Sequence, residues 1–374
     1  MALAPLPDYP WDAMAPFAES AARHPGGIVD LSIGSPVDAT PEIVRRALAE
    51  ATDAHSYPAT IGTIDVRTAV VEWFARRRNV PGLMTDQVIP TIGSKEFVAF
   101  LAYMLGLGDG DVVVHPVNAY PTYAVGAAMS GATAVASDDP AEWPENTRLV
   151  WLNSPGNPDG RVLDVEQLRV RVARARELGA IIVGDECYAE LGWDGRWASE
   201  RVPSILDDRV TGGDSRGVLA IYSLSKQSNM AGYRAAFAAG CRETIARLTT
   251  VRKHAGLMVP APLQHAMAVA LRDDGHVAAQ RELYRRRRTV LRDALGAAGF
   301  RIDGSEAGLY LWATEGLDAW RTIARLADVG ILAGPGPFYG GSSAEHVRLS
   351  LTATDERIDA AIDRLRALRD TAAG

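Results

Sequence analysis

The chain has 374 residues, of which 47% are hydrophobic and 23% charged, so it can bury a large core and predicts one large domain with a smaller one. Its formal net charge of −7 argues against nucleic acid as the main partner, because phosphate backbones are held by an excess of Lys and Arg. The N-terminus has no basic start followed by an apolar run, and no apolar stretch is long enough to cross a membrane, so we expect a cytoplasmic protein without membrane partners.

Short apolar runs alternate with helical patterns over the first two thirds of the chain, which predicts an α/β fold with a mostly parallel central sheet flanked by helices. The expected strands are 88–89, 111–115, 149–152, 181–184, 218–223 and 235–239. Past about Pro260 the pattern changes to Arg- and Ala-rich helices, followed by strands at 308–313 and 346–351 and a helix at 355–369, which is typical of a smaller α+β domain. We therefore expect an N-terminal arm at 1–40 that joins the small domain, a large domain at 41–258 and a small C-terminal domain at 259–374.

An arginine cluster and the two cysteines also lead to structural predictions. Arg285 to Arg288 lie within the helical pattern at 277–295, and we interpret them as a solvated helix face. Cys187 and Cys241 are the only cysteines and lie in or beside apolar segments, which favours buried thiols in a reducing compartment over a disulfide framework. No metal site is predicted.

The stretch from Tyr222 to Lys226, with Arg234 eight residues after the lysine, contains the residue types that a pyridoxal phosphate (PLP) site needs. A desolvated lysine among cations can lose its proton near neutral pH and bond to an aldehyde, while hydroxyls and an arginine anchor a phosphate. The apolar run 218–221 predicts a buried strand, so Ser223 and Lys226 would lie at a strand's carboxyl end, where open α/β sheets place ligands. For these residues alone, a solvated loop lysine is the alternative.

Two further strand ends carry groups that suit the same cofactor. Gly93 to Glu96 opens a helix, whose backbone N–H groups and dipole would attract a phosphate, although ordinary capping is the alternative. Asp185 ends the apolar run 181–184, where an unpaired carboxylate is costly, so it needs a cation such as a protonated pyridine nitrogen. A helix N-cap would also explain this aspartate. Tyr188, three residues later, could reach the phenolic oxygen of the ring.

A turn-rich loop and an aromatic residue complete the candidates. The loop at 153–160 follows another strand end, and its amides could bind a ring oxygen, although turn chemistry alone would explain its composition. Tyr120 could stack on a planar cofactor or belong to the core.

In this order, these segments resemble the class I/II aminotransferases of the fold type I PLP-dependent superfamily over nearly the whole chain. The matching motifs are Gly34-Ser35-Pro36, Tyr57-Pro58 with Gly62, Gly93-Ser94-Lys95-Glu96, Tyr120-Pro121-Thr122-Tyr123, Asn153 to Gly160, Asp185 to Tyr188, Ser223 to Lys226, Gly232 to Arg234 and Arg348-Leu349-Ser350. Asp159 departs from the family, whose members often have threonine there, but it lies outside the contact positions.

The resemblance implies PLP as cofactor and assigns a role to each matching residue. Lys226 would bond to the cofactor and then move the proton between the substrate Cα and the cofactor C4′, and Asp185 would pair with the pyridine nitrogen. The remaining implied cofactor contacts are Asn157 and Tyr188 at the ring oxygen, Tyr120 on the ring, and Ser94, Lys95, Ser223 and Arg234 at the phosphate. Arg348 would grip the substrate α-carboxylate, for which its planar fork is suited, and Gly34 would lie against that carboxylate.

The family's tyrosine that matches Tyr57 reaches the phosphate of the neighbouring subunit, which implies a homodimer with shared active sites. Within the family, the segments 3–11, 34–38 and Tyr57-Pro58 look like the actinobacterial N-succinyldiaminopimelate aminotransferases of lysine biosynthesis. The expected reaction is therefore amino transfer between N-succinyl-LL-2,6-diaminopimelate and 2-oxoglutarate.

Three alternatives remain beside this expectation. The substrate could be another amino acid, such as aspartate or an aromatic one. The same fold also serves β-eliminating C–S lyases, which would release pyruvate from cystathionine. A PLP-sensing transcription regulator is the least expected of the three, because it would need an added basic DNA-binding domain and the chain starts almost directly at the aminotransferase arm.

Overall fold

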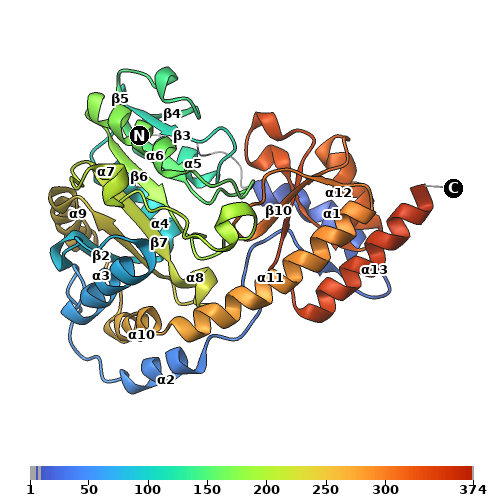
Figure 1. Cartoon of the computed structure of the whole chain (residues 1–374), viewed down its shortest axis with the longest axis horizontal. Helices are drawn as coiled ribbons and strands as arrows, with labels where there is room; N and C mark the ends of the chain where they lie inside the picture. Colours follow the sequence, from blue (N-terminus) through green and yellow to red (C-terminus); the bar gives the residue numbers. More distant parts are fainter. Residues whose placement is uncertain (1–5, 7–9, 373–374) are drawn as a thin grey trace.

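The computed structural model describes residue 6 and residues 10–372. A seven-stranded sheet forms the centre of the larger part of the molecule, with strand order β2-β8-β7-β6-β5-β3-β4 (Figure 1). Strand β8 is antiparallel to both of its neighbours, and the other pairs are parallel, so the predicted mostly parallel α/β sheet is confirmed. The strands are β2 Val88–Ile92, β3 Val112–His115, β4 Thr133–Ala136, β5 Thr147–Asn153, β6 Ile181–Asp185, β7 Val218–Ser223 and β8 Ala235–Gly240.

Both faces of this sheet are covered by helices because both sets of alternating strand side chains are apolar. On β7, Val218, Ala220 and Tyr222 pack in a core with α2, α3, α6, α7 and α10, whereas Leu219 and Ile221 pack in a second core with α4, α5 and α9. The helices of this part are α2 Glu42–Glu50, α3 Ile64–Arg78, α4 Gly93–Met104, α5 Thr122–Ser130, α6 Val165–Glu177, α7 Asp208–Thr211, α8 Leu224–Gln227, α9 Arg242–Ala255 and α10 Ala261–Arg272.

The smaller part has its own core around an antiparallel sheet of order β12-β13-β10-β9. A parallel pair of β1 and β11 joins the N-terminal segment to this part, and the long helix α11 runs beside α13 (Figure 1). The elements are β1 Val29–Asp30, β9 Arg301–Ile302, β10 Tyr310–Thr314, β11 Ile331–Leu332, β12 Gly334–Pro335, β13 Val347–Ser350, α1 Ala15–Ala22, α11 Asp274–Ala297, α12 Ala319–Asp328 and α13 Asp355–Ala372.

The division of the chain at 40 and 258 stays a prediction. Helix α10 lies beyond the second of these positions, yet it packs on α2 and α3 beside the large sheet. Positions 1–5 and 7–9 of the expected arm, which include part of the 3–11 motif, lie outside the described residues.

The interpretation of Arg285 to Arg288 as one solvated face is wrong for two of the four. Arg285 and Arg286 are exposed, but Arg287 and Arg288 are 4% and 5% exposed. Four consecutive residues of a helix turn through about 300°, so they cannot all share one face. Both buried guanidiniums are paired with carboxylates: the Arg287 partners are Asp38 and Asp355, each at 2.7 Å, and the Arg288 partner is Asp194.

Two composition-based expectations can be compared with the structure. Cys187 and Cys241 are both buried free thiols. Among the described helices, none combines the length and the apolar character needed to cross a lipid bilayer.

Candidate active site

The carboxyl ends of β5, β6 and β7 meet at one edge of the large sheet and place Asn153, Asp185 and Ser223 there. Asn153 is paired with Asp185 across β5 and β6, and the Asn153 Nδ2 donates to the Asp185 carbonyl at 3.0 Å. The Asn153 Oδ1 accepts the Asn157 backbone N–H at 2.8 Å, which fixes the loop after β5. The topology thus brings three predicted segments together at the position where open parallel sheets bind ligands.

Asp185 is a buried carboxylate that lacks a cation. It is 7% exposed, and among the described residues no Lys, Arg or His forms an ion pair with it. The Tyr123 hydroxyl donates to Oδ2 at 2.7 Å, and the Cys187 backbone N–H donates to Oδ1 at 3.3 Å. Burial raises the pKa of Asp185 despite these hydrogen bonds. A cation at this position would restore the charged form of the carboxyl.

Lys226 lies in the short helix α8, where the Ser223 side chain accepts the Ser225 N–H at the N-cap. The lysine Nζ donates to the backbone carbonyl of Gly34, which reaches the site from the N-terminal segment. Burial lowers the pKa of Lys226, and the nearby Arg348 and Arg234 act in the same direction. A lysine in this environment has an amine that loses its proton more readily than a solvated one.

The start of α4 and the Arg234 side chain form a cradle suited to an anion. Gly93 has φ +75°, and a Cβ built there would lie 2.4 Å from Arg234 Nη2, so the guanidinium occupies the space that a side chain would fill. Ser94 is near enough to the Cys187 thiol to act to lower its pKa, which places the start of α4 close to the end of β6. Helix N-terminal N–H groups beside a guanidinium are a favourable environment for a phosphate.

Arg348 on β13 is 3% exposed and has no carboxylate partner among the described residues. Its Nη1 donates to Asn157 Oδ1 at 2.8 Å and its Nη2 to the Ser32 carbonyl at 2.6 Å, while its Nε has no hydrogen-bond acceptor. The guanidinium carbon lies 3.9 Å from the centre of the Tyr310 ring and 4.8 Å from that of Tyr339. A buried guanidinium that packs against two rings and lacks an anion suits a ligand carboxylate.

The other predicted residues are not all placed in this cluster. Tyr188 is buried, and its hydroxyl lies 3.2 Å from that of Tyr310. Tyr120 is partly buried and makes an edge contact with Tyr123, with ring centres 5.9 Å apart. Lys95 is exposed, and Tyr57 is 95% exposed, so Tyr57 does not contribute to the site of its own chain.

Three tyrosines of the site were not predicted as separate candidates. Tyr123 stood only as part of a motif, and its bond to Asp185 spans 62 positions of the chain. Tyr310 and Tyr339 face Arg348 from β10 and from the segment after β12. An apolar strand gives no local sign that one of its tyrosines faces an arginine, so only the fold reveals them.

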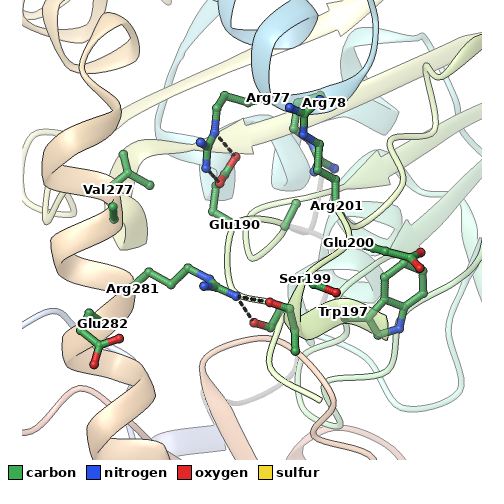
Figure 2. A pocket seen from close by; sticks show the side chains of 14 residues that line it. Arg77, Arg78, Glu190, Trp197, Ser199, Glu200, Arg201, Val277, Arg281 and Glu282 are labelled. Atoms are coloured by element: carbon green, nitrogen blue, oxygen red, sulfur yellow. Dashed lines mark hydrogen bonds and ion pairs between the residues drawn. The ribbon is translucent and has the colours of Figure 1, made fainter. Parts of the chain in front are cut away.

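A cavity of about 320 Å³ lies apart from this cluster, between the end of α3, the segment 189–201 and α11 (Figure 2). Two of the arginines that line it already have partners. Arg77 pairs with Glu190, and Arg281 donates to the backbone carbonyls of Gly192 and Ala198. None of the predicted site residues lines this cavity.

The fold and the site define a class, the PLP-dependent enzymes of fold type I. The sequence model of the family described as aminotransferase class I and II matches residues 27–365, and the chain belongs to this family. It is therefore a PLP-dependent aminotransferase that acts on amino acid and oxo acid substrates.

Relatives and solved structures agree with this membership. The chain is 52% identical to the 4-dedimethylamino-4-oxo-anhydrotetracycline transaminase OxyQ of Streptomyces rimosus, over 96% of this chain and 99% of that protein. It is 51% identical to a probable aminotransferase of Mycobacterium tuberculosis, over 97% and 86%, and 32% identical to the LL-diaminopimelate aminotransferase of Aquifex aeolicus, over 91% and 92%. The structure of an aminotransferase from Staphylococcus aureus has a TM-score of 0.84 at 26% identity, covering 93% of this chain and 95% of that one.

The described residues fit PLP. The cofactor offers a pyridine nitrogen, an aldehyde and a phosphate, and the site offers a buried carboxylate without a cation, a lysine with a lowered pKa and an anion cradle at Gly93. When bound, PLP supplies an electron sink for the negative charge that develops at the substrate Cα.

Proposed function

We propose that Lys226 holds the cofactor and moves the proton at the substrate Cα, and that Asp185 pairs with the ring nitrogen. Tyr188 and Asn157 would bind the ring oxygen, and Tyr120 would contact the ring. Ser94, Lys95, Ser223 and Arg234 would hold the phosphate. The convergence of the Asp185, Lys226 and Gly93–Arg234 environments at one edge of the sheet supports these roles.

Arg348 would bind the α-carboxylate of each amino and oxo acid substrate, with Gly34 against it. The supporting observation is the burial of this guanidinium without an anionic partner among the described residues. Its bond to Asn157 fixes the direction in which the fork points. An incoming carboxylate would satisfy the open Nε, which gains a charge-assisted hydrogen bond.

For the substrate, we propose amino transfer between N-succinyl-LL-2,6-diaminopimelate and 2-oxoglutarate. The motifs that look like N-succinyldiaminopimelate aminotransferases support it. Further support comes from relatives named LL-diaminopimelate aminotransferase, which are 30–32% identical over at least 90% of this chain. The rivals from the sequence, aspartate or aromatic amino acids and β-elimination of cystathionine, use the same cofactor residues.

A second candidate is amino transfer to an oxo group on a polycyclic compound. It is favoured by the 52% identity to a transaminase named for an oxo-anhydrotetracycline. In that case Arg348 would serve the amino acid donor alone.

The test is a single-turnover titration of the cofactor-loaded enzyme, in which the loss of visible cofactor absorbance is the readout. N-succinyl-LL-2,6-diaminopimelate, LL-diaminopimelate, glutamate, aspartate, phenylalanine and cystathionine are compared in parallel, and the aminated enzyme is then mixed with 2-oxoglutarate or the oxo-anhydrotetracycline. Rapid loss with the succinylated substrate and glutamate supports the proposal. Reaction of the oxo-anhydrotetracycline, without reaction of the succinylated substrate, would favour the second candidate, and pyruvate release from cystathionine would identify a lyase.

We further propose a homodimer in which Tyr57 of each subunit reaches the phosphate site of the other. A tyrosine ring that is 95% exposed in the single chain supports this, because large aromatic side chains are usually buried at least in part. Mixing inactive Lys226→Ala with weakened Tyr57→Ala chains tests it. Shared sites predict that hybrid dimers regain one intact site, whereas sites built from one chain predict no gain on mixing.

A further inference from the structure

Four predicted site residues meet at Tyr310, a residue of β10 that is 5% exposed. Its ring lies under the Arg348 guanidinium at 3.9 Å, and its hydroxyl is 3.2 Å from that of Tyr188. A Cβ built on Gly34 would lie 2.2 Å from the Tyr310 hydroxyl, so the absence of a side chain at Gly34 makes room for it. Lys226 is close enough to influence the ionisation of Tyr310.

The two hydroxyls differ in their electrostatic surroundings. Burial acts to raise the pKa of Tyr310, but the positive charges of Arg348 and Lys226 outweigh it and lower that pKa. Burial, followed by the influence of Tyr310, raises the pKa of Tyr188 well above its ordinary value. The 3.2 Å distance lets either hydroxyl donate, so the donor is set by what else each hydroxyl binds.

A hydroxyl carries a single hydrogen, and this constrains the pair further. If Tyr188 donates its hydrogen to the cofactor's ring oxygen, the 3.2 Å bond between the tyrosines can be made only with the hydrogen of Tyr310. The chain of donors then runs in one direction, from Tyr310 to Tyr188 and from Tyr188 to the ring oxygen. Each bond in such a chain polarises and strengthens the next.

We propose that Tyr310 is a positioning residue with two separable actions: its hydroxyl directs the Tyr188 hydrogen toward the ring oxygen of the cofactor, and its ring supports Arg348. The inference rests on the roles proposed above for Tyr188 and Arg348. Tyr310, a side chain of the smaller sheet, thereby links the carboxylate end of the site to the cofactor end.

The test separates the hydroxyl from the ring. Tyr310→Phe keeps the ring and removes the hydroxyl, so we expect the pH midpoint of the visible cofactor absorbance to rise by roughly half a unit to one unit, the effect of losing one hydrogen bond that supports a negative ring oxygen. The apparent KM for amino and oxo acids should stay within about twofold, because the ring remains under Arg348. Tyr310→Leu removes both actions. Besides the shift in midpoint, it should raise the apparent KM for amino and oxo acids by about tenfold.

Two comparisons make the result specific. Tyr339→Phe removes a hydroxyl from the other ring that faces Arg348, and it should leave the pH midpoint unchanged because that hydroxyl has no hydrogen-bond partner among the described residues. Tyr188→Phe should raise the midpoint. Adding Tyr310→Phe to it should have no further effect, since the relay of hydrogen-bond donors from Tyr310 through Tyr188 to the ring oxygen is already broken.

The outcomes distinguish this inference from the function on which it rests. A wild-type midpoint in Tyr310→Phe, or an equal shift with and without Tyr188, would overturn the relay alone. An unchanged midpoint in Tyr188→Phe would remove the proposed role of Tyr188, and the relay with it.

Discussion

The Tyr123 hydroxyl donates a 2.7 Å hydrogen bond to Asp185 Oδ2, and this bond joins the first turn of α5 to the carboxyl end of β6. The Tyr123 ring is stacked on Trp151 with ring centres 5.1 Å apart. The packing of the Tyr123 ring on Trp151 of β5 therefore holds the hydroxyl in place. It favours the charged form of a carboxyl whose pKa burial raises.

Tyr123→Phe should weaken the affinity of the apoenzyme for PLP by about fivefold to tenfold, because a buried hydrogen bond contributes about 1 kcal/mol. The loss also raises the pKa of Asp185 further, which makes the carboxyl a poorer partner for a ring cation. Titration of the apoenzyme with PLP measures the effect. Tyr103→Phe, the same change at a tyrosine exposed on α4, is the matched control, and equal affinities in both variants would contradict the role given to Tyr123.

Lys226→Ala should abolish turnover and the visible absorbance of the lysine-bound cofactor. Near wild-type turnover in this variant would rule out the assigned role, and circular dichroism verifies that the variant is folded.

Lys226 should also give the apoenzyme a pH-dependent stability. Its folded-state pKa is lowered from 10.5, so the unfolded chain binds more protons between the folded pKa and 10.5, and stability rises with pH through that window. Lys226→Met should therefore raise the Tm of the apoenzyme at neutral pH, by an amount that shrinks as the pH approaches 10.5. A gain in Tm that stays constant from neutral to alkaline pH would show that burial does not lower this pKa.

Arg348→Ala should raise the apparent KM for 2-oxo acids by about a hundredfold or more, since truncating one partner of a buried charge pair costs about 2–5 kcal/mol. Arg348→Lys should recover only part of the loss because an ammonium lacks the planar fork. Arg301→Ala, at an exposed arginine paired with Asp303, is the control for lost charge. Steady-state kinetics with both substrates decides, and an unchanged KM would count against the carboxylate site.

Gly93→Ala should lower the affinity for PLP by about tenfold or more, because the new methyl would displace the Arg234 guanidinium from its place 2.4 Å away. Gly106→Ala is a matched control: Gly106 also has positive φ, +78°, but nothing lies within 4 Å of its built Cβ. Both variants should lose about 1 kcal/mol of stability from backbone strain, and only the first should lose cofactor affinity. Equal PLP affinities would argue against the cradle.

Asp38→Ala should destabilise the protein by about 2–4 kcal/mol, because it leaves the buried Arg287 with one carboxylate fewer. Burial acts to raise the pKa of Asp38, but its bonds to Arg287 and Gln280 lower it below 3.8, so this stabilisation is complete above pH 3.8 and is lost as the pH falls through the folded pKa. Glu282→Ala breaks an exposed pair with Arg285 and should cost less than about 0.5 kcal/mol. Urea unfolding of both variants gives the comparison.

The sequence by itself determined six of the seven strands of the large sheet, all except the edge strand β4, together with the strand ends that carry Asp185 and Ser223 and the family. These features are local, because a buried strand needs an unbroken apolar run and the loop after it carries the polar groups. The family motifs are likewise short segments whose order along the chain can be read directly.

The tertiary structure alone decided which side chains act on one another. The Tyr123 bond to Asp185, the pairing of Tyr188 with Tyr310 and the burial of Arg287 but not Arg286 depend on contacts between residues 62, 122 and 249 positions apart. The periodicity of apolar residues indicates whether a face is buried or exposed, but it does not indicate which distant group that face contacts. Partners across a fold are set by how the elements pack, and an apolar strand such as β10 carries a tyrosine for its core or for its site with the same local pattern.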